Sequence, residues 1–130
     1  MILLFKFFFL YLAPRRHPDV CSLSANEIPV VSLLIQGGYD CARLILEHLK
    51  KQLPVVVVRG SGGLADLLAY AYYEVSERPR GIQDAEYVEN SLKRELANKI
   101  AHHFPHLREN NLARNLFRDR IMECVRYAHQ

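Results

Sequence analysis

Two glycine turns give this sequence its clearest candidate for a chemical site. Glycines let backbone amides approach an anion closely and adopt positive φ without strain. Where such a turn leads into a helix, the helix adds unpaired N–H groups and a partial positive charge that favour phosphate. The candidate phosphate-binding residues are Gly37, Gly38, Arg59, Gly60, Ser61, Gly62, Gly63 and Asp66.

Three side chains of the second turn could add to this site. The Ser61 hydroxyl could donate a hydrogen bond to a phosphate, and Arg59 could supply a positive charge. Asp66 would lie in the first turn of a helix, where it either stabilises the dipole or contacts a ribose or a loop amide. The pattern is neither GxGxxG nor a P-loop, because no Gly-Lys-Ser/Thr follows. A tight turn whose glycines only let the helix pack on the sheet is therefore an open alternative to anion binding.

Elsewhere the sequence shows no catalytic constellation and no metal site. Ser61 does not lie in a GxSxG elbow, and His48 has no nucleophile in an evident sequence relation to it. The histidines at 102, 103 and 106 lack a cysteine pair or an HExxH motif, whereas a structural zinc site needs about four ligands. Solvated histidines at a helix end explain them better. We expect no catalytic residue and no bound metal.

The elements that position the glycine turns repeat one order of strand, turn and helix. Val30–Ile35 predicts a strand buried on both faces of a sheet, and Asp40 is the candidate N-cap of the helix that follows. That helix places these residues on one side: Cys41, Leu44, Ile45, His48 and Leu49. Val55–Val58 predicts the second strand. The helix after it, from about Leu64 to Ser76, has a buried stripe of Ala65, Leu68, Ala69 and Tyr72.

Two more helices are predicted after a loop at residues 78–84. The first spans Tyr87–His103 and aligns Val88, Leu92, Leu96 and Ile100, and Pro105 ends it. The second, roughly Glu109–Tyr127, carries Leu112, Leu116, Ile121 and Val125. The predicted fold class is α/β, a partial Rossmann-like parallel sheet of about two strands with flanking helices. Because such a sheet leaves an edge unpaired, the sequence predicts a truncated domain.

The first thirteen residues, MILLFKFFFLYLA, are the strongest anomaly of composition. They are too short to span a membrane, which takes about twenty apolar residues. They match a signal peptide only in part, because Lys6 interrupts the apolar run and no convincing cleavage site follows. We interpret residues 1–26 as a non-native extension. The alternative is that residues 1–13 are a secretory signal and the protein is secreted.

Length and charge limit the remaining classes of function. A chain of 130 residues forms one domain at most, and a net charge of +3 is too small to indicate nucleic-acid binding. The three cysteines, at 21, 41 and 124, are an odd and widely spaced set. Such a set is a poor disulfide framework and is typical of a reducing compartment.

The two strand–glycine units together resemble a known family. The sequence is similar to the N-terminal cytoplasmic homology region of melastatin-type transient receptor potential (TRPM) cation channels, a Rossmann-like region of the SLOG superfamily. The resemblance rests on Ile28–Val31, Gly37-Gly38, Pro54–Val58, Gly60–Gly63 and Ala65–Ala69. It covers residues 27–130, roughly four-fifths of the chain. Residues Ile100–Pro105 and Arg120–Glu123 fit more loosely, as helices before the next strand of that region.

The resemblance implies part of a calcium- or other cation-permeable channel. Neighbouring subunits of a homotetramer would be its partners, on the cytoplasmic face of a membrane. In some members this region binds an adenine nucleotide or ADP-ribose, which makes such a molecule the candidate ligand. Many members carry an arginine where this chain has Gly63, and others carry glycine. The pore helices of the family do not occur in this sequence.

A small nucleotide-processing enzyme of the same superfamily, of the phosphoribohydrolase type, is the alternative function. Such enzymes resemble this chain in fold and typically add a glycine-rich segment with a catalytic glutamate, PGGxGTxxE. No such segment occurs here. We therefore expect a regulatory and assembly domain rather than an enzyme.

Overall fold

The computed structural model describes residues 31–77 and 85–130 of the chain. The predicted N-terminal extension, the start of the first predicted strand and the loop at residues 78–84 lie outside these ranges. In chain order the elements are β1 (Ser32–Leu34), α1 (Cys41–Lys50), β2 (Val55–Val57), α2 (Gly63–Glu77), α3 (Ala85–His103), the 3-10 turn η2 (Pro105–Leu107) and α4 (Asn111–Ala128).

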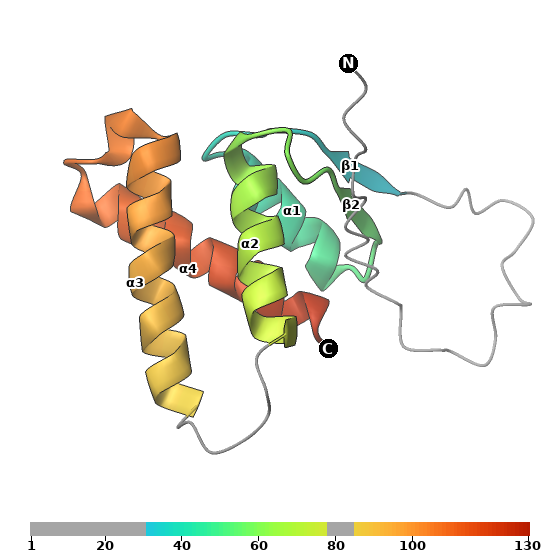
Figure 1. Ribbon diagram of the computed structural model, residues 1–130. Helices are drawn as coiled ribbons and strands as arrows, with labels where there is room; N and C mark the ends of the chain where they lie inside the picture. The colour runs from blue at the N-terminus through green and yellow to red at the C-terminus, as the bar shows by residue number, and fades with distance from the viewer. Residues whose placement is uncertain (1–30, 78–84) are drawn as a thin grey trace, which may run out of the picture.

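The two strands lie side by side and run parallel (Figure 1). Ser32 is in register with Val55, and Leu34 with Val57. Because parallel neighbours need a crossover, α1 connects them, as the order strand–turn–helix predicts. This arrangement confirms the α/β fold class and a small Rossmann-like parallel sheet with flanking helices.

The prediction that the first strand is buried on both faces is wrong for the residues described. Leu34 is 5% exposed, whereas Val31 is 60%, Leu33 62% and Ile35 58% exposed. Successive side chains of a strand point to opposite faces, so burial of Leu34 exposes its two neighbours. In the second strand Val55 and Val57 are each 1% exposed. The unbroken valine run therefore indicates the better-buried strand.

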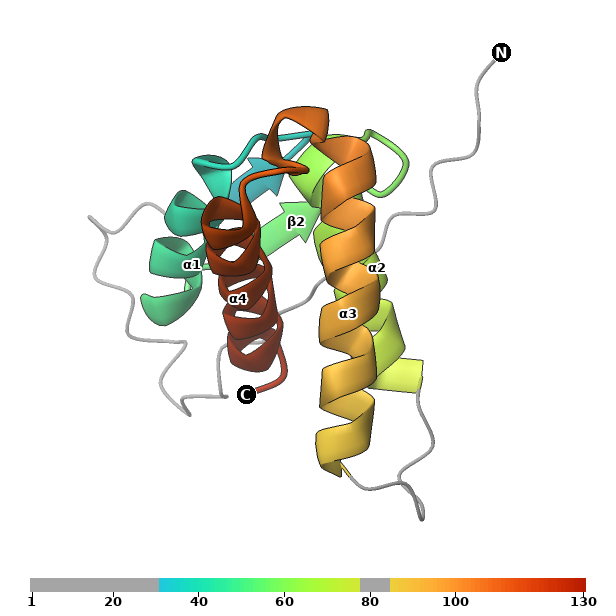
Figure 2. The ribbon, with the colours of Figure 1, turned by 90° about the vertical axis from the view of Figure 1, so that its left-hand side faces the viewer.

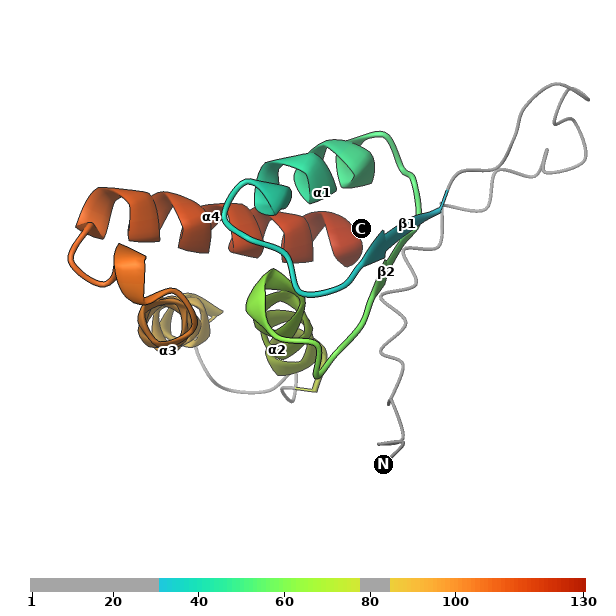
Figure 3. The ribbon, with the colours of Figure 1, turned by 90° about the horizontal axis from the view of Figure 1, so that it is seen from above.

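The helices form layers around α4. Figure 3 shows α1 on one side of α4, and α2 and α3 on the other, with α4 crossing these two steeply. Figure 2 shows the same order from the side, with α4 between α1 and α3. Both α1 and α2 contact β2, which joins the sheet to this core. Within the described ranges, no helix is long and apolar enough to cross a membrane.

The buried stripe of α1 differs in part from the predicted one. Its buried residues are Ala42, Ile45, Leu46 and Leu49. Their i, i+3, i+4, i+7 spacing is that of one helix face. Leu44, which was predicted on that face, is 57% exposed. Asp40 does precede the helix, but its side chain makes no capping hydrogen bond.

The stripe of α4 begins later than predicted. Leu112 is 73% and Leu116 45% exposed, so their predicted place on the buried face is wrong. The buried face starts at Phe117, which is fully buried, with its ring 5.3 Å from that of Tyr39 and 5.2 Å from that of Phe104. Ile121 and Val125 are buried as predicted. In the preceding helix, Leu92, Leu96 and Ile100 are buried as predicted.

Candidate functional site

The fold brings the two glycine turns together at the carboxyl ends of the strands, where ligands bind in open α/β sheets. The Gln36 amide donates to the Ser61 hydroxyl at 2.8 Å. The amides of Leu64 and Ala65, at the start of α2, donate to the carbonyls of Gly37 at 2.9 Å and Gln36 at 2.8 Å. Residues about 25 positions apart therefore form one connected loop structure.

Two polar groups of the second turn, the Ser61 hydroxyl and the Gly60 amide, are engaged within this structure. The Ser61 hydroxyl donates to the Val58 carbonyl at 2.7 Å. The Gly60 amide donates to the Asp66 carboxylate at 2.7 Å, which is the contact to a loop amide considered for this side chain. Because Leu64 and Ala65 already donate to carbonyls, the N-terminus of α2 directs these two amides at the first turn.

Gly63 is a glycine for steric reasons. Its φ is +55°, and a Cβ at this position would lie 2.5 Å from the Gly37 carbonyl oxygen. L side chains rarely adopt such a φ, and no Cβ tolerates so short a distance to backbone. Gly38 differs, because no heavy atom lies within 4 Å of a Cβ built there. The geometry thus accounts for Gly63 by the packing of α2 against the first turn.

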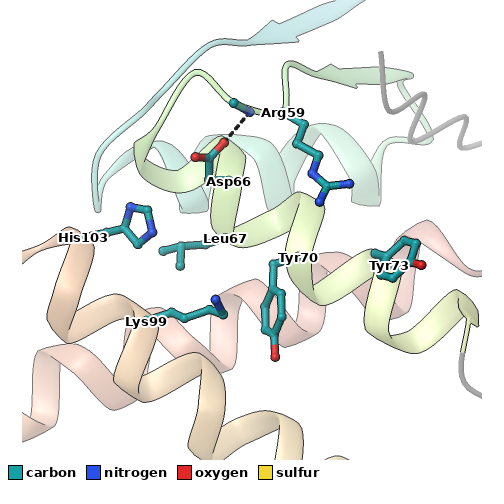
Figure 4. Close-up of a pocket in the computed structure, with 8 residues that line it drawn as sticks. Arg59, Asp66, Leu67, Tyr70, Tyr73, Lys99 and His103 are labelled. Carbon is teal, nitrogen blue, oxygen red and sulfur yellow. Dashed lines mark hydrogen bonds between the residues drawn. The ribbon is translucent and has the colours of Figure 1, made fainter. Parts of the chain in front are cut away.

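A pocket of about 260 Å³ lies beside the second turn, between α2 and the end of α3 (Figure 4). Its lining residues are Arg59, Gly60, Asp66, Leu67, Tyr70, Tyr73, Lys99 and His103. Three of them, Arg59, Gly60 and Asp66, belong to the candidate site predicted from the sequence. The predicted residues Gly37, Gly38, Ser61, Gly62 and Gly63 do not line the pocket.

Two cationic side chains of this pocket each lie over a tyrosine ring. The Lys99 ammonium lies 4.3 Å from the centroid of the Tyr70 ring. The Arg59 guanidinium lies 6.0 Å from the centroid of the Tyr73 ring. Such pairs hold a cation in place by the attraction of the ring face. The Tyr70 hydroxyl donates to Glu95, which fixes the ring from its other end.

The α3 wall of this pocket was not predicted from the sequence. Lys99 and His103 are four residues apart, a spacing that puts both on one helix face. That spacing was a usable signal, but only the packing of α3 against α2 shows which surface they face.

Away from the pocket, Ser32 and His48 form a hydrogen bond between the Ser32 hydroxyl and Nδ1 of the imidazole. The two residues are 16 positions apart, so the fold makes a pair that has no evident relation in the sequence. The bond links the start of β1 to α1.

Metal-ligating side chains do not cluster in the described part of the chain. No group of three or more His, Cys, Asp and Glu residues there could hold a metal ion. The rings of His102 and His103 lie 5.7 Å apart, and the ring of His106 lies 6.0 Å from that of Phe104.

The two cysteines within the described ranges are both free and differ in their environment. Cys41 is half-buried, whereas Cys124 is 1% exposed and has its sulfur 3.9 Å from the Ala42 carbonyl oxygen. The pKa of the Cys124 thiol is raised to about 12, first by burial and then by the negative charge of nearby Glu123. Since the thiolate is the reactive form, Cys124 is a structural side chain.

Comparison with known proteins identifies the class of protein to which this fold belongs. Residues 15–124 match the profile of the family described as "SLOG in TRPM". The chain therefore belongs to this family of channel-associated Rossmann-like domains.

Individual relatives agree with the family match. The chain is 33% identical over 103 residues to the mouse (Mus musculus) transient receptor potential cation channel subfamily M member 6, which is 78% of this chain and 4% of that protein. It is 42% identical over 52 residues to the Rattus norvegicus subfamily M member 7, which is 38% of this chain and 3% of that protein. It is 30% identical over 77 residues to a Nematostella vectensis subfamily M member-like 2 protein, which is 59% of this chain and 5% of that protein. The chain thus spans only a few per cent of the length of these relatives, and no solved structure matches it.

Proposed function

We propose that this chain acts as a regulatory and assembly region of a TRPM-type cation channel, on the cytoplasmic face of the membrane. The observation that carries this function is the family match over residues 15–124. The relatives are named cation channels, and the two parallel strands with their glycine edge agree with a SLOG-type domain. Residues 27–130 would be the domain and residues 1–26 an extension. Neighbouring subunits of a homotetrameric, calcium-permeable channel would be its partners.

The assembly role is tested by a chimera. In mouse subfamily M member 6, the 103 matched residues are replaced by those of this chain. The chimera should form tetramers and reach the cell surface, as cross-linking and surface biotinylation would measure. A second chimera carrying Phe117→Asp, which places a charge in a fully buried position, should do neither. Assembly of both chimeras alike would contradict a role of this fold in assembly.

The finer part of the proposal is that this domain senses an adenine nucleotide or ADP-ribose at the edge where the two glycine turns meet. Its support is the position of Gly37, Gly38 and Gly60–Gly63 at the carboxyl ends of both strands, with Arg59 and Asp66 beside them. The Gly60, Leu64 and Ala65 amides have partners within the chain, so a ligand there either displaces these bonds or binds at the rim.

Calorimetry tests the sensing role. The full chain is titrated with ADP-ribose, ATP and inorganic phosphate, after circular dichroism has shown helix and cooperative unfolding. Saturable heat with either nucleotide is expected. A folded sample without heat from any of the three would overturn nucleotide sensing, while the family assignment would stand on the comparisons.

The enzyme alternative gains no support from the arrangement of side chains. The matched family and the named relatives are those of TRPM channels. We therefore propose a channel domain rather than a phosphoribohydrolase.

A further inference from the structure

One face of the β1–β2 sheet presents a row of apolar side chains to water. Val31, Leu33 and Ile35 alternate in and beside the first strand, and each is more than half exposed. Alternate residues of a strand point to the same face, so these three side chains form one row. Val56 is in register with Leu33 and half-buried, and it continues the row onto β2. These four residues are called the bare face below.

The opposite face of the same strands is packed against helices. Leu34, Val55 and Val57 are buried on it, and Ser32 bonds to His48 of α1. Figure 3 shows the two strands at one end of the helix layers. Parallel sheets are ordinarily covered on both faces. Among the elements that the structure describes, none buries the bare face, so one of the two expected layers is missing there.

The bare face has the character of a contact surface. Single exposed apolar side chains are ordinary, whereas a contiguous group of them is typical of a site that another segment or molecule covers. None of its four side chains carries a charge or a hydrogen-bonding group, so charge does not select the occupant. Removal of apolar area from water is the favourable contribution that remains. The occupant is therefore an apolar segment.

The N-terminus of the same chain contains such a segment. Residues 1–13 include one charged side chain, Lys6, among apolar and aromatic ones. They precede the family match, which begins at residue 15. Residues 14–30 join this segment to Val31, the first residue of the bare face. Fully extended, a link of that length reaches about 60 Å, whereas the face from Val31 to Ile35 is only about 13 Å long.

Tethering favours this segment over a second copy of the chain. A stable interface between two proteins takes about 20–30 residues on each side, far more than the bare face offers. A tethered segment needs much less contact, because a short link gives it an effective concentration on the order of millimolar. In a micromolar solution of the protein, the segment therefore occupies the face in preference to a second copy.

We propose that residues 1–13 fold back on the bare face and pack their apolar side chains against Val31, Leu33 and Ile35. The segment supplies the second layer of the sheet. Lys6 stays at the rim of the contact, since burial of an unpaired ammonium is costly. The inference goes beyond the proposed channel function and does not depend on nucleotide sensing.

Tryptophan fluorescence tests this arrangement, because the chain contains no tryptophan. Phe8→Trp places a single reporter in the segment of the full chain. In the monomer at micromolar concentration, the reporter should emit at short wavelength and resist quenching by acrylamide. Leu33→Asp and Ile35→Asp each put a charge on the bare face, which opposes apolar contact. Either substitution should shift the emission to longer wavelength and raise the quenching constant severalfold.

The matched control is Leu112→Asp, which puts the same charge on an exposed leucine of α4. It should leave the reporter shielded. Circular dichroism and a melting temperature for each variant separate loss of the contact from loss of the fold. Size-exclusion chromatography with light scattering shows that each sample is monomeric.

The proposal is overturned if the reporter is exposed in the otherwise unchanged monomer, or if Leu33→Asp and Ile35→Asp leave it shielded. Equal exposure of the reporter in Leu112→Asp would overturn it as well, because the effect would not be specific to the bare face. Shielding that appears only as the protein concentration rises would assign the face to a second copy. Shielding that needs phosphatidylcholine vesicles would assign the segment to a membrane. The family assignment stands in each case, because it rests on residues 15–124.

Discussion

Gly63 is the residue at which the turn is most constrained. Its positive φ and the 2.5 Å approach of a Cβ to the Gly37 carbonyl mean that Gly63→Ala forces the first turn and α2 apart. We expect a loss of about 2 kcal/mol or more in the free energy of unfolding, which urea denaturation would measure.

Two other glycines provide the controls for this substitution. Gly60→Ala meets no atom within 4 Å but keeps a φ of +88°, so it should cost about 1 kcal/mol through backbone strain alone. Gly38→Ala has neither constraint and should change stability by less than about 0.5 kcal/mol. Equal losses at all three positions would contradict the steric account of Gly63.

The more exposed of the two described cysteines should be the more reactive one. At pH 8 in the folded chain, iodoacetamide should modify half-buried Cys41 well before Cys124. The pKa of Cys124 is raised to about 12, so little thiolate exists at that pH. Mass spectrometry of a Cys21→Ser chain gives the order. Equal rates in the native state would show that Cys124 is accessible.

At the scale of elements, α4 is held to the core by one face that starts at Phe117. Phe117→Ala removes a fully buried ring that touches Tyr39 and Phe104 and should cost about 3–5 kcal/mol. Leu116→Ala, at the adjacent position that is 45% exposed, should cost less than about 1 kcal/mol. Thermal and urea unfolding of both variants would measure the difference. A larger loss at Leu116 would mean that α4 is rotated from this arrangement.

A charged contact connects α3 to α4. Glu89 accepts from Arg126 at 2.7 Å and from Lys93 at 2.9 Å. The pKa of Glu89 lies below its ordinary value of 4.5. The hydrogen bond from Lys93 lowers it most, and the charge of Lys93 and the contact with Arg126 lower it further. A carboxyl with a lowered pKa stabilises the fold when ionised. Its contribution is therefore complete above about pH 4.5 and lost as the pH falls through the folded value.

Glu89→Gln should accordingly flatten the loss of stability on acidification below about pH 4.5. Near pH 7 the substitution should cost less than about 1 kcal/mol, because the contact is at the surface. Urea unfolding between about pH 3 and 7 measures both effects. Glu77→Gln, at an exposed position at the end of α2, is the control and should leave the slope unchanged. An unaltered slope in Glu89→Gln would contradict the contact.

Sequence patterns predicted the elements well and their contacts less well. The helix predicted at Leu64–Ser76 spans Gly63–Glu77, because its apolar spacing and preceding glycines are local signals. The α4 stripe was wrong at Leu112 and Leu116 because the step from 116 to 121 breaks helical spacing, whereas 117 to 121 keeps it. The bonds of the Leu64 and Ala65 amides were not predictable, since their partners lie in the other turn. Lys99 was missed because its neighbour Tyr70 lies on another helix.

At the scale of the whole molecule, three parts of the chain have distinct roles. The sheet edge brings both glycine turns together, and α4 packs against α1, α2 and α3. The α2–α3 pocket adds cationic side chains beside the second turn. The family match over residues 15–124 makes this arrangement part of a channel-associated domain.

The measurement that tests the central claim most directly is the cation current of the mouse subfamily M member 6 chimera that carries the matched residues of this chain. In excised inside-out patches, we expect a cation current with calcium permeability that changes when ADP-ribose or ATP is applied to the cytoplasmic side. The Arg59→Gln chimera should conduct but respond at least about tenfold less sensitively. A chimera that assembles at the surface yet carries no current, or one whose current ignores both nucleotides, would contradict the account of this chain as a regulatory channel domain.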